Sequence, residues 1–411
     1  MRRTLTALAL MLGLPLTVFA CLWDRDTPAV EAKGMPEVVA ALTGRFARNP
    51  PLYYAMRLER VASHLQSHPE DLAAYDDAGV ACDRLGRGDE AIAWMEKERA
   101  QLDKLDVSRR DVKEHEYRYH ANLGTFLVHR WVREGADRAR IAEVKSARDE
   151  IAKALEINPK AHFGREKYQL KAIEWIIDPP KMPESDDSFT LPNLLGFGYR
   201  SAPKPQDADD AVKGLSGLIV LGNAWESVDI FYALGVALGY DSIGFQEGAE
   251  GGRNSLAHFA RLRCVELIDA GKGSMLLGAP KGDELKSILH VSKYMPEDGR
   301  AISIPFAKLR AEADAWQLAR TEFMNGRLKE GRHPDTDPHF WDGYQESPPP
   351  SLPGKSQRQI DAERMARNWA RVRLAAGVAT MLAVVGFATW RYRRSVKNRG
   401  AKLAPAHMSL D

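Results

Sequence analysis

Four potential metal ligands alternate over seven residues in the segment His-Pro-Asp-Thr-Asp-Pro-His. They are His333, Asp335, Asp337 and His339. Imidazole and carboxylate groups are donors that bind zinc in proteins. Two prolines stiffen this segment, however, and neither a cysteine nor a second group of ligands completes a coordination shell. We therefore expect a solvated linker at this position and no metal site.

A glycine-rich stretch at residues 244–252 contains Glu247 and Glu250. A phosphate-binding loop follows a strand and usually has Lys-Ser or Lys-Thr where the next helix opens, and this stretch has neither. We expect a flexible connection between helices. The sequence also has no Gly-x-Ser-x-Gly elbow, no His-Glu-x-x-His and no useful Cys/His spacing. We predict that the chain is not an enzyme and needs no cofactor.

One alternative to a non-enzymatic function is an enzyme with its active site in residues 180–330. The titratable candidates there are His258, Glu266, Glu247 and Glu250, and none of them belongs to a motif. A cleft in which such groups converge would favour this reading. A module that binds an envelope ligand or the cell wall is the other alternative.

The composition is that of an ordinary globular protein. The chain has 411 residues, of which 44% are hydrophobic and 28% charged, with a net charge of +2. This balance does not indicate nucleic-acid binding, and we expect no nucleic-acid partner. The three cysteines, Cys21, Cys82 and Cys264, do not make a disulfide framework. We expect Cys82 and Cys264 to be small buried residues.

The most informative stretch, residues 75–95, has the spacing of two packed helices. Tyr75 is followed by the small pair Ala78 and Gly79, and Ala91 and Met95 come after a turn. Helices cross closely only where side chains are small, so we expect Gly79 to lie against Ala91. This pattern resembles one tetratricopeptide repeat (TPR), a helix pair of about 34 residues that stacks on copies of itself.

A second copy follows, and the first departs from the family pattern in two ways. Glu98 occupies the second small position of the second helix, and no proline closes the repeat near Asp103. In the second copy, Gly124 lies on a helix expected over 112–133. Its second helix is matched by Ala147, Ile151, Ala154 and Pro159, after an insertion of 11 residues. A helix at about 161–176 would cap these copies or begin another.

The resemblance implies a helix-turn-helix (TPR-like) α-solenoid with an additional, degenerate helical region, and the apolar segment near the C-terminus predicts one transmembrane helix, so we expect an all-α fold. Further helices are expected near residues 208–222, 224–239, 254–270 and 305–329, with irregular packing or one short strand pair in 271–311. The whole arrangement is similar to a class of exported, membrane-anchored bacterial TPR proteins, a likeness that brings no known activity.

In this family, unpacked residues of each first helix line a groove that binds a protein or peptide partner. Carried onto this chain, the groove residues are Asp76, Val80, Asp83, Arg84, Arg118, Ala121, Thr125 and His129. Asp76 and Asp83 share one helix face, where they could pair with a basic group or an N-terminus of a partner. The alternatives are that these charges only confer solubility, or that the chain's own downstream helices fill the groove.

Both ends of the chain carry membrane signals. Residues 1–20 have a basic start, an apolar stretch and small residues before Cys21, as in a secretory signal peptide. An uncleaved anchor and lipidation of Cys21 remain alternatives. Residues 374–390 are seventeen residues without a charge, followed by a basic tail. We predict a transmembrane helix, a cytoplasmic C-terminus and a main domain outside the cytoplasmic membrane.

We therefore divide the chain into a signal peptide (1–20), a TPR-containing helical domain (21–178), a second helical region (179–330), a Pro-rich spacer (331–368), a transmembrane helix (369–392) and a basic tail (393–411). The tail is expected near anionic lipid. The function expected from these parts is that of a non-enzymatic scaffold or assembly factor for protein partners in the envelope, presented by a single membrane anchor.

Overall fold

The structure, a computed structural model, forms two compact units, residues 1–352 and 353–411. It describes residues 24–25, 38–106, 108–159, 164–181, 192–198, 201–222, 224–239, 252–289, 299–348 and 365. The predicted signal peptide, transmembrane helix and basic tail lie outside these residues and stay predictions. Among the described residues, no helix is both long and apolar enough to cross a membrane.

The described part of the first unit is all-α, as predicted. Its helices are α2 (Val38–Thr43), α3 (Pro51–Ser67), α4 (Leu72–Arg84), α5 (Gly88–Leu102), α6 (Arg110–Arg133), η1 (Arg138–Arg140), α7 (Ile141–Ile157), α8 (Arg165–Ile177), α9 (Pro205–Leu221), η3 (Ala224–Glu226), α10 (Val228–Gly239), α11 (Gly252–Asp269), α12 (Gly282–Ile288) and α13 (Gly299–Lys329). In 271–311, where we expected irregular packing or one short strand pair, the described residues contain α12 and the start of α13, and Leu277 makes an isolated β-bridge with Lys181.

Local sequence signals set several helix ends. Pro51 begins α3 at a position where its missing N–H costs nothing. The side chain of Asp71 caps α4 by accepting a hydrogen bond from the backbone N–H of Ala74. Gly86, with φ of +78°, provides the left-handed turn after α4. The helix α7 ends before Pro159, which cannot continue it.

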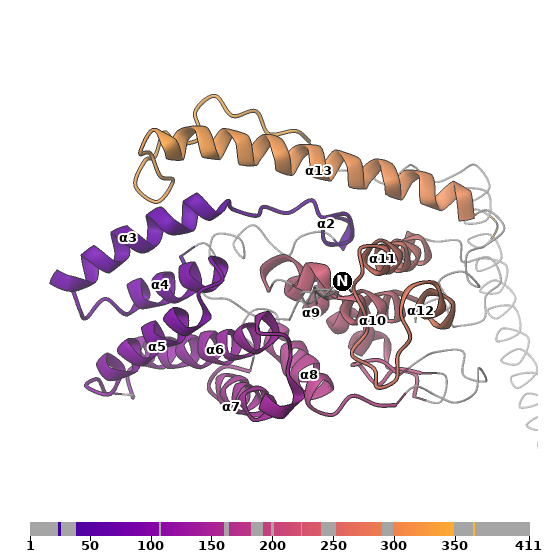
Figure 1. The fold of residues 1–411 in the computed structure, drawn as a ribbon, viewed down its shortest axis with the longest axis horizontal. Coiled ribbons are helices and arrows are strands. Elements are labelled where there is room, and N and C mark those ends of the chain that lie inside the picture. The colour runs from indigo at the N-terminus through magenta and orange to yellow at the C-terminus, as the bar shows by residue number, and fades with distance from the viewer. Residues whose placement is uncertain are drawn as a thin grey trace, which may run out of the picture. The chain divides into compact units, whose positions relative to one another are not determined.

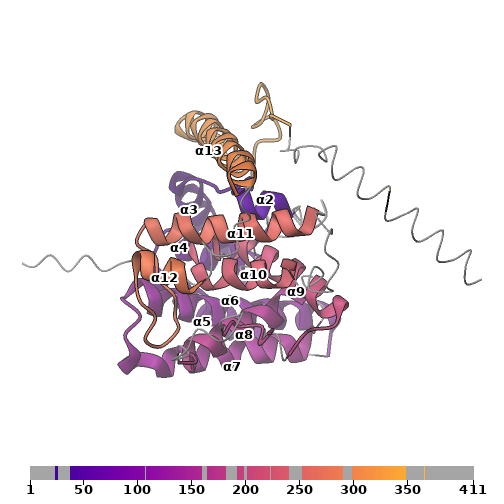
Figure 2. The same ribbon diagram turned by 90° about the vertical axis from the view of Figure 1, so that its right-hand side faces the viewer.

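From α3 to α11, each of these long helices packs against the next one along the chain (Figure 1). Seen from the side, they form successive layers, from α7 through α8 and α10 to α11 (Figure 2). The helix α13 packs on α11, α2 and α3. It therefore connects the last helices of the series to the first.

The two predicted helix pairs, α4–α5 and α6–α7, meet at glycines. A side chain at Gly124 would come within 2.8 Å of Ile151 and 2.9 Å of the carbonyl oxygen of Ala147, the two helix-B residues expected there. At Gly79 the nearest atoms belong to Met95 and Phe126. The nearest atom of α5 thus belongs to Met95, one turn after the expected Ala91.

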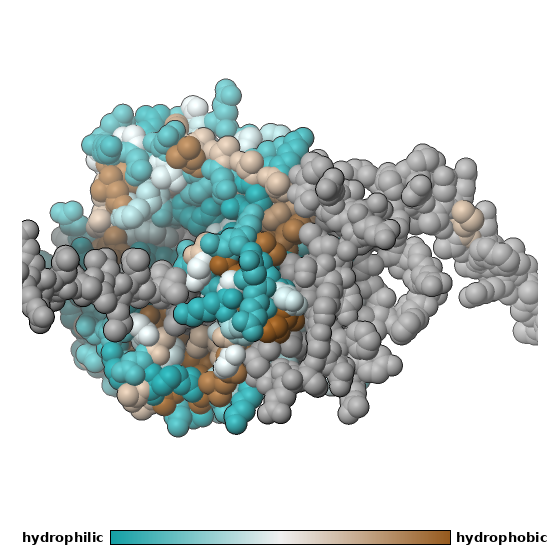
Figure 3. Space-filling view, turned by 45° about the vertical axis from the view of Figure 1, so that its right-hand side comes forward, coloured by the Kyte–Doolittle hydropathy of each residue, from teal (hydrophilic) through white to brown (hydrophobic). Residues whose placement is uncertain are grey.

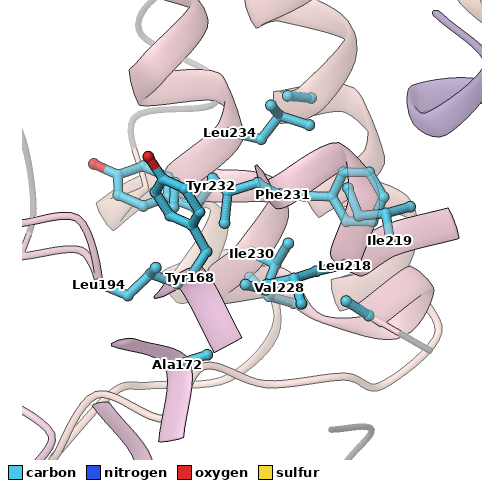
Figure 4. Close-up of a cluster of buried hydrophobic side chains, with 14 of the residues drawn as sticks. Tyr168, Ala172, Leu194, Leu218, Ile219, Val228, Ile230, Phe231, Tyr232 and Leu234 are labelled. Carbon is cyan, nitrogen blue, oxygen red and sulfur yellow. The ribbon is translucent and has the colours of Figure 1, made fainter. Parts of the chain in front are cut away.

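One hydrophobic core extends across the boundary that we predicted at residue 178. It includes Ile173 of α8, Leu215 of α9 and Phe231 of α10, all fully buried. Figure 4 shows α8, α9 and α10 contributing side chains to this cluster. Burial of each large apolar side chain contributes about 1.5–3 kcal/mol. The two predicted helical regions thus share a core within one compact unit.

The sequence placed the start of a solvated spacer at residue 331, and this boundary needs correction. Phe340 is fully buried against Tyr53 of α3 and against Met324 and Leu328 of α13. His333 stacks on the Tyr53 ring at 4.6 Å. The chain is therefore packed well beyond residue 331, because apolar and aromatic side chains here find partners on α3 and α13.

Candidate functional site in the polar layer between α4, α5 and α6

The residues assigned to the groove lie mostly inside the protein. Arg84 and Arg118 are partly exposed, whereas six are buried: Asp76, Val80, Asp83, Ala121, Thr125 and His129. Their side chains face neighbouring helices of the same chain. In this structure a partner could reach Arg84 and Arg118 but not the two aspartates.

The helices α4 and α6 are joined by a repeated polar contact. Asp76 accepts a hydrogen bond of 2.8 Å from the side-chain amide of Asn122. Seven residues further along both helices, Asp83 lies 2.8 Å from Nδ1 of His129. Arg133 adds an ion pair of 2.7 Å to Asp83. Asp76 and Asp83, which lie seven residues apart on one face of α4, therefore both bind residues of α6.

The chain's own later segments cover further parts of this face. The side-chain amide of Gln169 on α8 donates to Thr125 on α6 at 2.9 Å. Arg84 donates to the carbonyl oxygen of Leu221 at the end of α9 at 3.1 Å. An upstream residue also binds α4, since the backbone N–H of Arg25 donates to Asp77 at 3.0 Å. These contacts favour the alternative in which the chain fills its own groove.

Asp83 is held as a carboxylate. Burial opposes its ionisation, but His129 and Arg133 outweigh this effect and keep the pKa of Asp83 below its usual range. The group contributes stability above the pH at which an unfolded aspartate titrates, and this contribution decreases as the pH falls. Asp83 is therefore paired with two residues of the same chain, His129 and Arg133.

A second group of polar side chains comes from three different helices. Asp76 of α4, Glu98 of α5 and His115 of α6 each place one potential ligand atom within 4.8 Å of the other two. We call this group the three-helix cluster. Asp76 and Glu98 are buried, while 22% of the His115 side chain is exposed. Among the described residues, this is the group whose donors could hold a metal ion.

The cluster contains polar atoms that the described residues do not satisfy. Neither carboxylate oxygen of Glu98, nor Oδ2 of Asp76, nor Nδ1 of His115 has a hydrogen-bond partner among them. Burial raises the pKa of Glu98 well above its usual range, and the neighbouring Asp76 adds to this effect. Burial also raises the pKa of Asp76, against the opposing charge of Arg118. Burial lowers the pKa of His115, which favours its neutral form.

Sequence reasoning missed Glu98 and His115 as site residues. The signal for Glu98 was present, since a long acidic side chain stands where the repeat pattern has a small residue. Its carboxylate extends into the space between α4 and α6, where Asp76 and His115 lie. His115 had no comparable signal. It lies three residues before Arg118 on a helix with several charged residues, and nothing in the sequence distinguishes it from them.

The other candidates do not converge on one site. Glu266 pairs with Arg263 at 2.7 Å and with Arg310 at 3.2 Å. Burial lowers the pKa of His258, for which the described residues provide no acidic partner within ion-pair distance. Glu247 and Glu250 lie outside the described residues.

The four alternating potential ligands at 333–339 do not converge on one point either, although His333 lies 3.5 Å from Asp335. Asp335 binds Arg57, with two hydrogen bonds of 2.8 and 2.7 Å. Asp337 instead pairs with Arg332 at 2.5 Å. His333 contacts the backbone carbonyl of Tyr53, and His339 lies beside Asp342.

Comparison of the chain with protein-family models, with curated proteins and with solved structures found no match. The structure shows an all-helical protein of sequentially packed helices. These comparisons identify no family for it.

Proposed function

We propose that residues 70–160 are two TPR copies and that the chain is a non-enzymatic interaction scaffold or assembly factor of the envelope. The observation that carries this proposal is the pair of hairpins α4–α5 and α6–α7, in which Gly79 and Gly124 lie at close contacts between helices. Proteins built from stacked helix pairs commonly bind other proteins over extended surfaces.

A partner would bind outside the face that the polar layer occupies. The face drawn in Figure 3 mixes hydrophilic and hydrophobic residues. On α13, Leu318 is 59% exposed, the largest exposure of any large apolar side chain described in the first unit. Ala311, Ala315 and Ala319 are exposed at helical spacing around it. An apolar stripe on an exposed helix is a surface on which a partner helix can pack.

The predicted membrane signals support a location for this scaffold. A cleaved signal at 1–20 and a transmembrane helix at 369–392 followed by a basic tail would both put the main domain outside the cytoplasmic membrane. These two inferences rest on different segments of the sequence. The tail, residues 393–411, would then lie near anionic lipid on the cytoplasmic side.

Co-purification of the full chain from detergent-solubilised envelope tests the proposal. The variant Leu318→Lys adds a charge to the apolar stripe. Glu312→Lys is the matched control, because it adds the same residue at an exposed position about a third of a turn around α13. Asp76 and Asp83 are less suitable, since changing a buried residue tests the fold and not the contact with a partner.

The expected result is one or two proteins retained by the unchanged chain and by Glu312→Lys, and lost with Leu318→Lys. Equal retention by all three chains would contradict the assignment to α13. If the unchanged chain retains no protein at low or moderate salt, the scaffold function itself is contradicted.

A further inference from the structure

We propose that the three-helix cluster of Asp76, Glu98 and His115 is a binding site for a divalent first-row transition-metal ion, with zinc as the best-matched ion. This site is independent of the proposed scaffold function. It also differs from our expectation from the sequence, which was that the chain binds no metal.

The donor set matches this class of ion. Two carboxylates and one neutral imidazole form a mixed oxygen and nitrogen set, which is suited to zinc and less suited to magnesium, an ion that prefers oxygen donors alone. Three protein ligands also leave a position for water or another ligand. Each donor comes from a different helix, so an ion would connect α4, α5 and α6.

The second observation is that the cluster contains unsatisfied buried groups. Glu98 is fully buried, and within the described residues neither of its oxygens accepts a hydrogen bond. A buried polar group without a partner destabilises the fold, and more so if it is charged. An ion coordinated by Glu98 would remove this destabilisation.

The distances are close to those of a coordinated ion. Nδ1 of His115 lies 4.0 Å from Oδ2 of Asp76, and no pair of donors is more than 4.8 Å apart. An ion at the centre of such a triangle would lie at most roughly 2.8 Å from each donor, and zinc bonds measure about 2.0–2.2 Å. Inward movements of at most roughly 0.6–0.8 Å per donor would complete the site.

One positive charge competes with a metal ion. Nη1 of Arg118 lies 4.0 Å from Oδ2 of Asp76. The same side chain already donates from Nε to Glu114, one turn earlier on α6, at 3.2 Å. Arg118 therefore has a second acidic partner when an ion takes its place beside Asp76. The partly exposed His115 provides an edge through which the ion can enter.

The test is a calorimetric titration of the full chain in detergent, after removal of metal with EDTA, with zinc, manganese and magnesium chloride in turn. We expect one zinc ion per chain and an affinity order of zinc over manganese over magnesium. Glu98→Gln and His115→Gln should each weaken zinc binding at least tenfold. Glu96→Gln, an exposed change on α5, should leave it unchanged.

Two further variants distinguish the metal site from a structural ion pair and from adventitious zinc. Removing the competing charge by Arg118→Gln should strengthen zinc binding several-fold, whereas a purely structural ion pair predicts only lower stability. His64 stacks on His68 at 4.4 Å and is partly exposed, so this histidine pair is where adventitious zinc would bind. Zinc binding that is lost with His64→Gln but kept with Glu98→Gln and His115→Gln would overturn the proposal, as would no binding at all.

Discussion

Replacement of Asp335 by Asn should destabilise the protein, because it removes the main partner of a buried arginine. The guanidinium of Arg57 is fully buried, and it donates two hydrogen bonds, of 2.8 and 2.7 Å, to Asp335. The side chain of Asp335 is only 4% exposed. This pair joins α3 to the segment after α13, so its loss also affects how these two parts of the chain are held together.

The structure gives a magnitude for this loss. Burial opposes ionisation of Asp335, but Arg57 and Arg60 lower its pKa from the usual 3.8 to about 2. At about 1.36 kcal/mol per pKa unit, this shift corresponds to about 2 kcal/mol. Breaking a buried pair costs about 3–5 kcal/mol. Asp24 remains 3.0 Å from Arg57 and offsets part of this cost, so we expect about 2–4 kcal/mol.

Urea unfolding of the full chain in detergent, followed by circular dichroism at pH 7, measures this difference. Asp337→Asn is the matched control, because Asp337 pairs with the more exposed Arg332 and should leave the unfolding midpoint unchanged. A double-mutant cycle with Arg57→Met isolates the pair itself. If Asp335→Asn unfolds at the same urea concentration as Asp337→Asn, the reasoning is refuted.

The pH dependence has a definite sign. Because the pKa of Asp335 is lower in the folded than in the unfolded protein, its contribution is present above about pH 4 and is lost as the pH falls towards 2. The difference in unfolding free energy between the unchanged chain and Asp335→Asn should therefore shrink over that interval. A difference that stays constant down to pH 2 would contradict an electrostatic origin.

Two further predictions concern the helix pairs, and a third concerns the two buried cysteines. Gly124→Ala should lower stability by about 1–3 kcal/mol in thermal unfolding, since the new methyl group would lie 2.8 Å from α7 side-chain atoms, whereas Gly326→Ala, with open space around it, should not. Asp83→Asn should destabilise at pH 7 and progressively less below pH 4, because His129 and Arg133 lower the pKa of Asp83; equal destabilisation at both pH values would contradict this. Burial raises the pKa of Cys82 to about 12 and that of Cys264 further, so thiol labelling read by mass spectrometry should modify these two only after unfolding.

The features that the sequence predicted well depend on contacts between near neighbours along the chain. The helix pair of Gly124 with Ala147 and Ile151 follows from spacing within one hairpin, and the structure has these residues in contact. The turn at Gly86 and the end of α7 before Pro159 are likewise set by local sequence. Backbone conformation and helical periodicity act over a few residues, which is why such patterns can be recognised in one sequence.

Features that join distant segments could not be predicted in this way. The pair of Arg57 and Asp335 links residues 278 positions apart, and no local pattern indicates it. For Asp83 and His129, the sequence placed both on the inner faces of their helices, but it could not show that they bind each other. Glu98 was recognisable only as a departure from a pattern, and its contact with the other two donors depends on the packing of three helices.

Site-specific photo-crosslinking from α13 tests the interaction function most directly. A photoreactive residue is introduced at Leu318, or at Glu312 as the control, in the full chain expressed in cells, and the products are identified by mass spectrometry. We expect position 318 to crosslink to one or two envelope proteins and position 312 to give no such products. The absence of crosslinks at 318, or the same products from both positions, would contradict an interaction scaffold that uses this face.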